Sequence, residues 1–454
     1  MEDKPNPFQQ NYRKVMEFRD SFVKYKPKDF PDEMFTSMLD PDNYPHEVHT
    51  TETEDGYILK LFRIQRRRTL MEPLGKPVVL LQHGVMDSAD CWVVNTKEKS
   101  LGLILADHGY DVWLSNSRGN KYSNKHTNKN ITYKDYFTYS FQQMGQYDVP
   151  ANIDYILSKT KQPDLVYIGH SQGTTQMFAA LSDSLTSEHI NRRVSLFIAL
   201  APVCYLANQG IAPAKFLSKH VKGVNETAKF LSIWMLGHPN KNKDGLLNKS
   251  FQGMINKILP KACGSFLEVT DPEYKKTVDV SRMGTFMIHF PSGSSVRCFA
   301  HYGQLVNTDH DHPIFRKYDR GKKTNLEEYG SEEPAHYDLT LVNTKVRLFV
   351  GEKDTLGDVA DNRALDWKLR SMGVDCKMEI IDDWGHMPFI WGSDPIPVFD
   401  KILKEIEDTL NSTDYRVGLR RNQGISDVIG FAEVDHEQRV DFELELQEPV
   451  EEGV

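Results

Sequence analysis

Short apolar runs alternate with longer helix-prone segments along much of the chain. The apolar runs, rich in β-branched and aromatic residues, lie at 77–81, 110–114, 165–168, 195–201, 345–350 and 377–381. The helix-prone segments lie at about 100–108, 142–158, 174–185, 360–372 and 397–410. Strand and helix in alternation are typical of a parallel sheet covered by helices. The pattern predicts an α/β fold with a mostly parallel central sheet and helices on both faces.

The same pattern divides the chain into segments. Residues 1–42 are polar and proline-bearing, which predicts an irregular lead-in. Alternation around Asp55-Gly56 predicts a hairpin at the start of the core. We expect 43–202 and 335–410 to form one core. The stretch between them, 203–334, is helix-prone and carries no strand–helix repeat, which predicts an inserted helical cap.

Composition and charge exclude several functions. The longest apolar runs fall far short of the ~18 residues that a membrane-spanning helix needs. Nine acidic residues and one arginine lie within 431–454, so almost all of the net charge of −9 belongs to the C-terminal tail. The nearly neutral remainder has no basic face for nucleic acid. We expect the acidic tail, 411–454, to be disordered, with a partner-binding role as the alternative.

The cysteines do not indicate a metal site. All five lie far apart, and no two form a C-x-x-C pair, so the spacing favours neither a metal centre nor a disulfide framework. Buried thiols are the expected state. The cysteine pattern therefore predicts no metal site.

The strongest chemical signal is the stretch 165–173, LVYIGHSQG. An apolar run, a glycine-flanked turn and a helix-prone segment follow one another, as the G-x-S-x-G motif requires. A side chain at the apex of such a turn has strained backbone angles, and neighbouring glycines avoid clashes. The context predicts that Ser171 is a nucleophile; an ordinary turn serine is the alternative.

A serine hydroxyl needs an adjacent imidazole, and the imidazole needs a carboxylate that orients it. On a parallel sheet these groups follow the carboxyl ends of strands in the order Ser, acid, His. Asp354 and His386 each follow a predicted strand in that order. The only other histidine beyond Asp354 is His436, in the acidic tail. Asp358 and Asp361 on the same loop remain alternatives for the acid.

An ester carbonyl under attack becomes an oxyanion, which two backbone N–H groups must stabilise. One donor is the residue after the nucleophile, Gln172. The second is expected on the loop after the early strand, where His83-Gly84-Val85 stands. We therefore predict Val85 as the second donor; the alternative is that this His-Gly pair only makes a tight turn.

Five stretches of the chain, taken together, are more specific than the G-x-S-x-G motif alone. They are QHGVMDSADCW at 82–92, GYDVWLSNSRGNKYS at 109–123, YDVPANIDYI at 147–156, GHSQG at 169–173 and HFPSGSSVRCFAHYGQLVN at 289–307. In this order they resemble the acid lipase family, which includes gastric and lysosomal acid lipases and intracellular steryl ester hydrolases. The resemblance runs from about residue 43 to about residue 391. It implies an α/β-hydrolase fold with a helical cap, and hydrolysis of acylglycerols or cholesteryl esters without metal or cofactor.

The resemblance also implies roles for particular residues. Ser171, Asp354 and His386 fall on the family's catalytic triad, Val85 and Gln172 on its oxyanion hole, and Arg118 in a motif that we interpret as structural. Two stretches depart from the family. The acid loop reads GEKD where GGND is frequent, and Met387-Pro388 follows the histidine where Leu-Asp is usual.

Two features bear on the compartment. The secreted relatives carry a cap disulfide, whereas this cap has no close cysteine pair, and the first 20 residues show no apolar core of a signal peptide. A cytoplasmic or lipid-droplet location is therefore favoured, with a lysosomal or secreted location as the alternative if a leader is missing.

The leading hypothesis is a serine-dependent carboxylic ester hydrolase that cleaves neutral lipids at a lipid–water interface through an acyl-enzyme. A short-chain esterase or an acyltransferase on the same fold is one alternative. A non-catalytic lipid-binding protein is another, but it would be expected to have lost a triad residue.

Overall fold

The computed structural model describes residues 27, 30–65, 77–209, 267–306 and 312–412, and the backbone of 235–236. Cys263, His436 and the acidic tail from residue 413 onward lie outside the described residues. Contacts divide the chain into a large unit, Met1–Thr409, and a C-terminal unit, Leu410–Val454. The central sheet lies in the first unit.

The described part of the chain contains a nine-stranded sheet in the order β1-β2-β4-β3-β6-β7-β10-β11, with β5 paired to β2. The strands are β1 (His46–Glu52), β2 (Tyr57–Gln65), β3 (Val78–Gln82), β4 (Asp111–Ser115), β5 (Lys125–His126), β6 (Leu165–His170), β7 (Val194–Leu200), β10 (Lys345–Gly351) and β11 (Cys376–Ile381). The six strands from β4 to β11 along this order are parallel. The mostly parallel sheet predicted from the apolar runs is therefore confirmed.

The predicted hairpin joins β1 to β2, which pair antiparallel from Glu52↔Ile58 onward. Its turn needs glycine, because Gly56 has a φ of 89° and a Cβ there would lie 2.6 Å from Thr127 Oγ1. The Thr53 hydroxyl accepts the N–H of Tyr57 at 2.8 Å and closes the turn.

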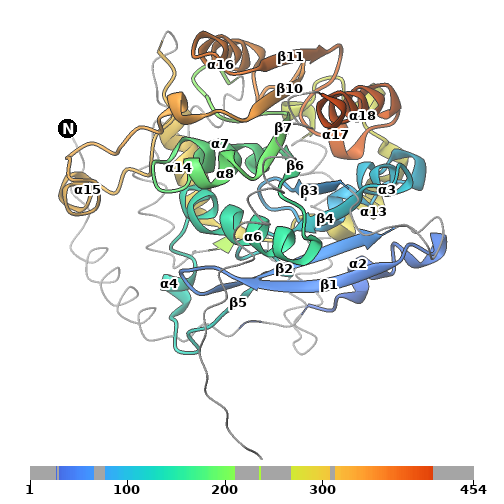
Figure 1. The fold of residues 1–454 in the computed structure, drawn as a ribbon, viewed down its shortest axis with the longest axis horizontal. Helices are drawn as coiled ribbons and strands as arrows, with labels where there is room; N and C mark the ends of the chain where they lie inside the picture. The colour runs from blue at the N-terminus through green and yellow to red at the C-terminus, as the bar shows by residue number, and fades with distance from the viewer. Residues whose placement is uncertain are drawn as a thin grey trace, which may run out of the picture. The chain divides into compact units, whose positions relative to one another are not determined.

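Helices cover both faces of the sheet. The main ones are α3 (Leu101–Asp107), α6 (Val149–Thr160), α7 (Gln172–Ser182), α16 (Val359–Ser371) and α18 (Ile396–Asn411). Figure 1 shows α6 and α7 on one side of the sheet and α3 and α18 on the other. Successive strand residues point to opposite faces: Leu80 packs in the core that α6 and α7 share, while Leu81 lies against Gly102 of α3.

One predicted helix is interrupted. In place of a single helix over 142–158, α5 (Phe141–Gln143) is followed by a π-helical turn, η4 (Met144–Asp148), and then by α6. Pro150 at the start of α6 has no N–H, so a regular α-helical hydrogen bond cannot form there. Asp148, at the end of the π turn, is buried and bonds to Arg118.

The predicted lead-in ends in two short helices, the first of which contacts the core. They are α2 (Glu33–Thr36) and η1 (Asp40–Asp42). Phe35 is fully buried and its ring stacks on that of Phe62 at 3.9 Å between centroids. The lead-in is therefore anchored to the core through Phe35, while most of its described residues are partly or fully exposed.

The remaining described elements are short, apart from the 11-residue helix α14 of the insertion. In the core they are η2 (Ala89–Trp92), η3 (Lys97–Lys99), α4 (Tyr133–Tyr136), α8 (Ser187–Asn191), η6 (Leu339–Leu341) and α17 (Pro388–Trp391). In the insertion they are α12 (Tyr274–Thr277), η5 (Val280–Arg282), α13 (Met283–His289), α14 (Val296–Val306), α15 (Lys322–Tyr329) and a small sheet of β8 (Met235–Leu236) with β9 (Ser294–Ser295). That this insertion forms a cap stays a prediction.

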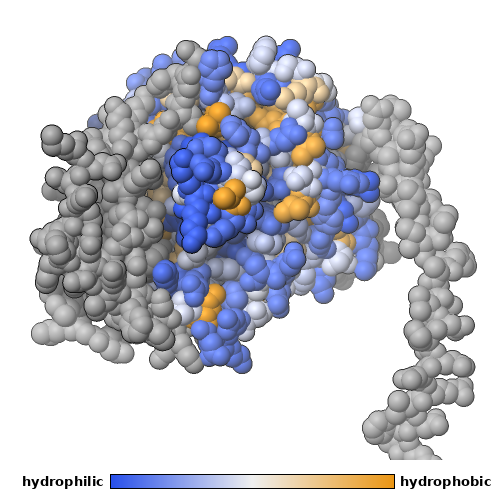
Figure 2. Space-filling view, turned by 90° about the vertical axis from the view of Figure 1, so that its left-hand side faces the viewer, coloured by the Kyte–Doolittle hydropathy of each residue, from blue (hydrophilic) through white to orange (hydrophobic). Residues whose placement is uncertain are grey.

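The described surface carries scattered apolar residues. On the face drawn in Figure 2, hydrophilic residues predominate and hydrophobic ones form small patches, which is normal for a protein surface. A search of the described residues finds no helix of the length and apolarity that a membrane crossing requires.

Candidate active site

Ser171 lies at the junction between β6 and α7 with a φ of 53° and a ψ of −119°. Few non-glycine residues adopt a positive φ, and such strain is typical of a nucleophile turn. The turn fits only if its neighbours lack side chains. A Cβ at Gly169 would lie 2.7 Å from the Gly173 backbone, and one at Gly173 would lie 2.3 Å from the Gln82 carbonyl oxygen.

His386 lies between the other two candidate residues. Its Nε2 is 2.8 Å from Ser171 Oγ, and its Nδ1 is 2.8 Å from Asp354 Oδ2. A carboxylate can only accept, so Nδ1 donates to Asp354 and the neutral ring accepts the Ser171 hydroxyl proton at Nε2. The structure thus brings together three side chains that are widely separated in the sequence.

The loop after β10 holds Asp354 rigidly. Its Oδ1 accepts the N–H groups of Leu356 and Gly357, each at 2.8 Å, which leaves Oδ2 for the imidazole. The two alternative acids are bound elsewhere. Asp358 caps α16 by accepting the Ala360 N–H, and Asp361 binds Asn208. Only Asp354 of the three contacts His386.

The cluster is almost dry. Ser171 is 7% exposed, and Asp354 and His386 are each 3% exposed. Burial alone would lower the pKa of His386, but the charge and hydrogen bond of Asp354, with a contribution from the charge of Asp271, raise it above its usual value. The ring is therefore a stronger base than an isolated imidazole in the same burial.

The loop after β3 lies beside the serine. A Cβ at Gly84 would lie 3.1 Å from Ser171 Cβ, so a larger residue would crowd the site. Neither Val85 nor Gln172 donates its backbone N–H to another described group. Two N–H groups without an acceptor next to a serine can stabilise an oxyanion.

His83 anchors this loop and does not reach the serine. Its Nε2 accepts the Ser117 N–H at 3.0 Å, so Nδ1 carries the proton and donates to the Gly84 carbonyl at 2.7 Å. Burial lowers the pKa of His83 to about 4, which keeps the ring neutral. The neutral tautomer therefore ties the loop after β3 to the loop after β4.

The chain is similar to known families and proteins. A family model described as a partial alpha/beta-hydrolase lipase region matches residues 35–96, and one described as the alpha/beta hydrolase fold matches residues 77–219. Lipase member J of Homo sapiens is 35% identical over 81% of this chain and 96% of that protein. Gastric triacylglycerol lipase of Rattus norvegicus is 34% identical over 79% of this chain and 88% of that protein, and the lysosomal acid lipase/cholesteryl ester hydrolase of Homo sapiens is 33% identical over 79% and 87%. The chain belongs to the acid lipase family.

Membership confirms the α/β-hydrolase fold and makes the protein a carboxylic ester hydrolase. The structure also shows how the chain accommodates Met387-Pro388, one of the two departures from the family noted above. Pro388 opens the short helix α17, where a missing N–H costs nothing, and the Met387 N–H is bound by Asp271. These substitutions leave the imidazole within reach of both partners.

The contacts that residues of the insertion make with the loops of the candidate site were not predicted from the sequence. Asp271 binds the loop that carries His386, and Ser292 donates its N–H to the Met86 carbonyl on the loop after β3. His289, also in the insertion, binds the buried Asp90 at 2.7 Å. Asp271 lies in none of the stretches that resemble the family, whereas His289 and Ser292 lie in the stretch 289–307. The resemblance does not give the contacts of these residues, so only the folded chain shows that the insertion contacts the site loops.

His170, inside the GHSQG motif, was also overlooked. Its Nε2 donates to the His386 carbonyl oxygen at 3.0 Å, and burial lowers the pKa of His170 to about 3. The neutral ring therefore supports the backbone of the histidine loop. The only indication in the sequence that His170 lies at the site was its position next to Ser171 in the motif.

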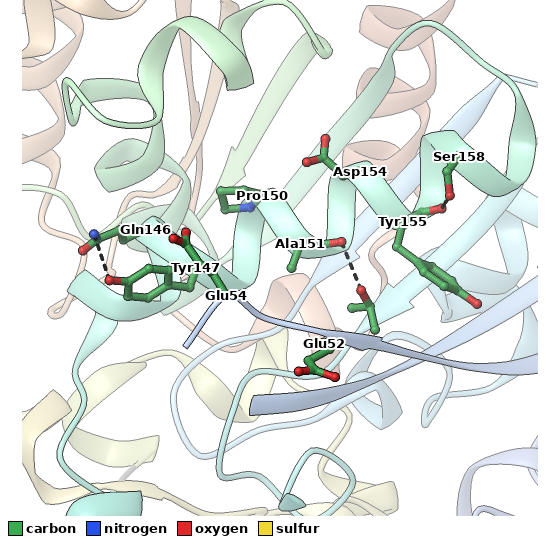
Figure 3. A pocket seen from close by; sticks show the side chains of 10 residues that line it. Glu52, Glu54, Gln146, Tyr147, Pro150, Ala151, Asp154, Tyr155 and Ser158 are labelled. Atoms are coloured by element: carbon green, nitrogen blue, oxygen red, sulfur yellow. Dashed lines mark hydrogen bonds between the residues drawn. The ribbon is translucent and has the colours of Figure 1, made fainter. Parts of the chain in front are cut away.

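A surface groove of about 500 Å³ lies between β1 and the helix α6 (Figure 3). Glu52, Glu54 and Asp154 line it, and none of the candidate site residues does. A groove with three carboxyl groups does not suit an apolar acyl chain. The described residues also hold no cluster of His, Cys, Asp and Glu that could bind a metal ion.

Proposed function

We propose that Ser171, His386 and Asp354 are the catalytic triad of this hydrolase, with Val85 and Gln172 as the oxyanion hole. The observation that carries the proposal is the continuous hydrogen-bond chain from Asp354 through His386 to the Ser171 hydroxyl. It has the geometry that nucleophile, base and orienting acid require.

In the first half of the reaction, Ser171 Oγ attacks the ester carbonyl carbon while His386 Nε2 takes its proton. The carbonyl oxygen becomes an oxyanion that accepts the N–H groups of Val85 and Gln172. His386 then gives the proton to the leaving alkoxide, the C–O bond breaks, and the alcohol departs. Asp354 stabilises the transient imidazolium and stays ionised.

In the second half, water replaces the alcohol. His386 takes a proton from the water as it attacks the acyl-serine carbonyl, and the same two N–H groups bind the second oxyanion. The proton returns to Ser171 Oγ as the acyl–serine bond breaks. The products are a carboxylic acid and the free enzyme.

The substrate that we propose is a neutral lipid ester, triacylglycerol or steryl ester, taken from a lipid–water interface. Relatives named for both substrates support this class. The insertion, about 203–334, would be the cap that receives the acyl chain, and the contacts of Asp271 and Ser292 with the site loops support that role. Val280 and Ile288 of the insertion expose apolar side chains that can meet a lipid surface.

The test is a panel of three substrates with the purified protein: cholesteryl oleate, triolein and p-nitrophenyl butyrate. We expect turnover of at least one emulsified long-chain ester that rises when the interface forms, with Ser171→Ala as the blank. Turnover of the soluble butyrate alone would instead indicate a short-chain esterase. Turnover that the blank retains would contradict the triad.

A further inference from the structure

Asp271 comes from the insertion, yet it is fully buried against the loop that carries His386. Its Oδ1 accepts the N–H of Met387 at 2.8 Å, and its Oδ2 accepts the Thr270 hydroxyl at 2.6 Å. A Cβ at Gly385 would lie 2.2 Å from the same Oδ1. The residues on both sides of His386 are therefore fitted to this one carboxyl group.

The segment that carries Asp271 also binds the acid loop. Thr355, directly after Asp354, donates its hydroxyl to the Val269 carbonyl at 2.7 Å. Its N–H points to the Thr270 carbonyl at 3.5 Å. One three-residue segment thus contacts the residue after the acid and the residue after the imidazole.

We propose that Asp271 is a positioning residue: its carboxyl group holds the His386 loop against the Asp354 loop, so that the imidazole stays between Ser171 and Asp354. The inference rests on the proposed function and adds to it a residue of the insertion. It makes the insertion a structural part of the active site as well as its cover.

The charges around the imidazole give this residue a second effect. The groups that face His386 are Asp354, Asp271 and His170, whose ring centroid is 5.1 Å away. His170 is neutral, so the two carboxyl groups dominate. Burial, with a smaller contribution from the charge of Asp354, raises the pKa of Asp271 to about 6. The hydrogen bonds to Thr270 and Met387 and the charge of His386 oppose this rise. Above about pH 6, a charged Asp271 therefore favours the protonated imidazole.

Two substitutions separate position from charge. Asp271→Asn keeps the size and one acceptor oxygen for the Met387 N–H but removes the charge. Asp271→Ala removes the acceptor as well. Glu268→Gln is the matched control, because Glu268 lies on the same segment and is exposed to solvent.

The experiment measures kcat and KM for p-nitrophenyl butyrate from pH 4 to pH 9, with kcat expressed per site titrated by an organophosphonate. For Asp271→Ala we expect a fall in kcat of about 10- to 100-fold with little change in KM, because a displaced catalytic group costs rate. For Asp271→Asn we expect kcat within about threefold of the wild type at high pH, and an acid limb of kcat/KM at lower pH, because the imidazole loses its proton more easily without the second charge. The control should show neither change.

A purely structural role would lower the thermal midpoint and the number of titratable sites but leave kcat per site and the pH profile unchanged; that result overturns the proposal. If Asp271→Ala does not fold, the profile of Asp271→Asn decides alone, and a curve that superimposes on the wild type overturns it. Failure of the proposed function is a separate result, since Ser171→Ala would then match the wild type whatever the Asp271 variants do.

Discussion

Two clusters of hydrogen-bonded polar side chains lie on loops that follow strands of this sheet, and we expect them to have different roles. In the first, Arg118 after β4 binds Asp148 through Nε at 2.7 Å and Asp55 through both terminal nitrogens, and its guanidinium lies 4.0 Å from the ring centre of Tyr57. In the second, His386 links Asp354 to Ser171. Arg118, Asp148 and His386 are all buried, and each is hydrogen-bonded, so burial and bonding alone do not distinguish a site from a scaffold.

The two clusters differ in whether their central side chain can gain and lose a proton. Burial alone would lower the pKa of Arg118, but the charges of Asp148 and Asp55 raise it, so the guanidinium stays charged at every accessible pH. It joins the β1–β2 turn, the loop after β4 and the π turn. The imidazole of His386 can gain and lose a proton, and its partner is a hydroxyl. We therefore expect changes in the Arg118 cluster to affect stability and changes in the His386 cluster to affect rate.

The largest expected effect is the loss of rate on Ser171→Ala. Without the hydroxyl no acyl-enzyme forms, and kcat for p-nitrophenyl butyrate should fall by about a million-fold. The thermal midpoint should change little, because a single hydroxyl at a strained turn is removed. A large loss of stability with turnover still fast would contradict the expectation that this cluster affects rate and not stability.

The next effect is that of Asp354→Asn, which should lower kcat by about 10⁴-fold, because an amide does not hold the imidazole in the required tautomer. Asp358→Asn on the same loop is the control. Asp358 caps α16, and asparagine is an equally good cap, so its variant should keep both rate and stability. Equal losses for the two variants would show that the loop, and not the particular carboxylate, matters.

Arg118→Met should lower the free energy of unfolding by about 3–5 kcal/mol, since it leaves the buried Asp148 without its partner. Denaturant titration measures this loss. The kcat of the molecules that remain folded should stay within about threefold of the wild type. Arg192→Met, which breaks an exposed pair with Glu188, should cost no more than about 0.5 kcal/mol. A rate loss without a stability loss at Arg118 would place it in the chemistry.

The smallest effect is the pH dependence of the His386 cluster. His386 must be neutral to accept the Ser171 proton, so kcat/KM should fall about tenfold per pH unit below its pKa, which is raised above the usual value. The protonated His386–Asp354 pair stabilises the fold with the opposite pH dependence. This stabilisation is present below the pKa of His386 in the unfolded chain and is lost as the pH rises through its higher pKa in the folded protein. Parallel rate and thermal-midpoint profiles would contradict this assignment. Arg118 should contribute no pH dependence in this range.

The sequence was most informative where the structure is local. The strained angles of Ser171 and the close packing of Gly169 and Gly173 follow from a strand, a turn and a helix that are continuous in the chain. The order of Asp354 and His386 could be read because the carboxyl ends of parallel strands share one edge of the sheet. From the residues alone, Asp354 was preferred but Asp358 and Asp361 stayed open as alternatives, because the choice depends on which side chain turns towards the histidine.

Contacts between distant segments were not predictable. Asp271 reaches His386 from an insertion without any regular pattern, and its role appears only when the two loops are packed together. The π turn before α6 was missed because apolar spacing does not register a local change of helical pitch. Arg118 was interpreted as structural, and that role stays a prediction; its contact with Asp148 at the end of the π turn was not predicted. Each of these features is set by tertiary packing.

The most direct test of the central claim uses a fluorophosphonate, which reacts with an activated serine to give a stable adduct. The full-length protein is treated with it, and the adduct is located by peptide mass spectrometry while esterase activity is followed. We predict one adduct, on Ser171, whose formation parallels the loss of activity and which does not form in His386→Ala. Activity that persists when Ser171 is fully modified, or an inactivating adduct at another residue, would contradict the account.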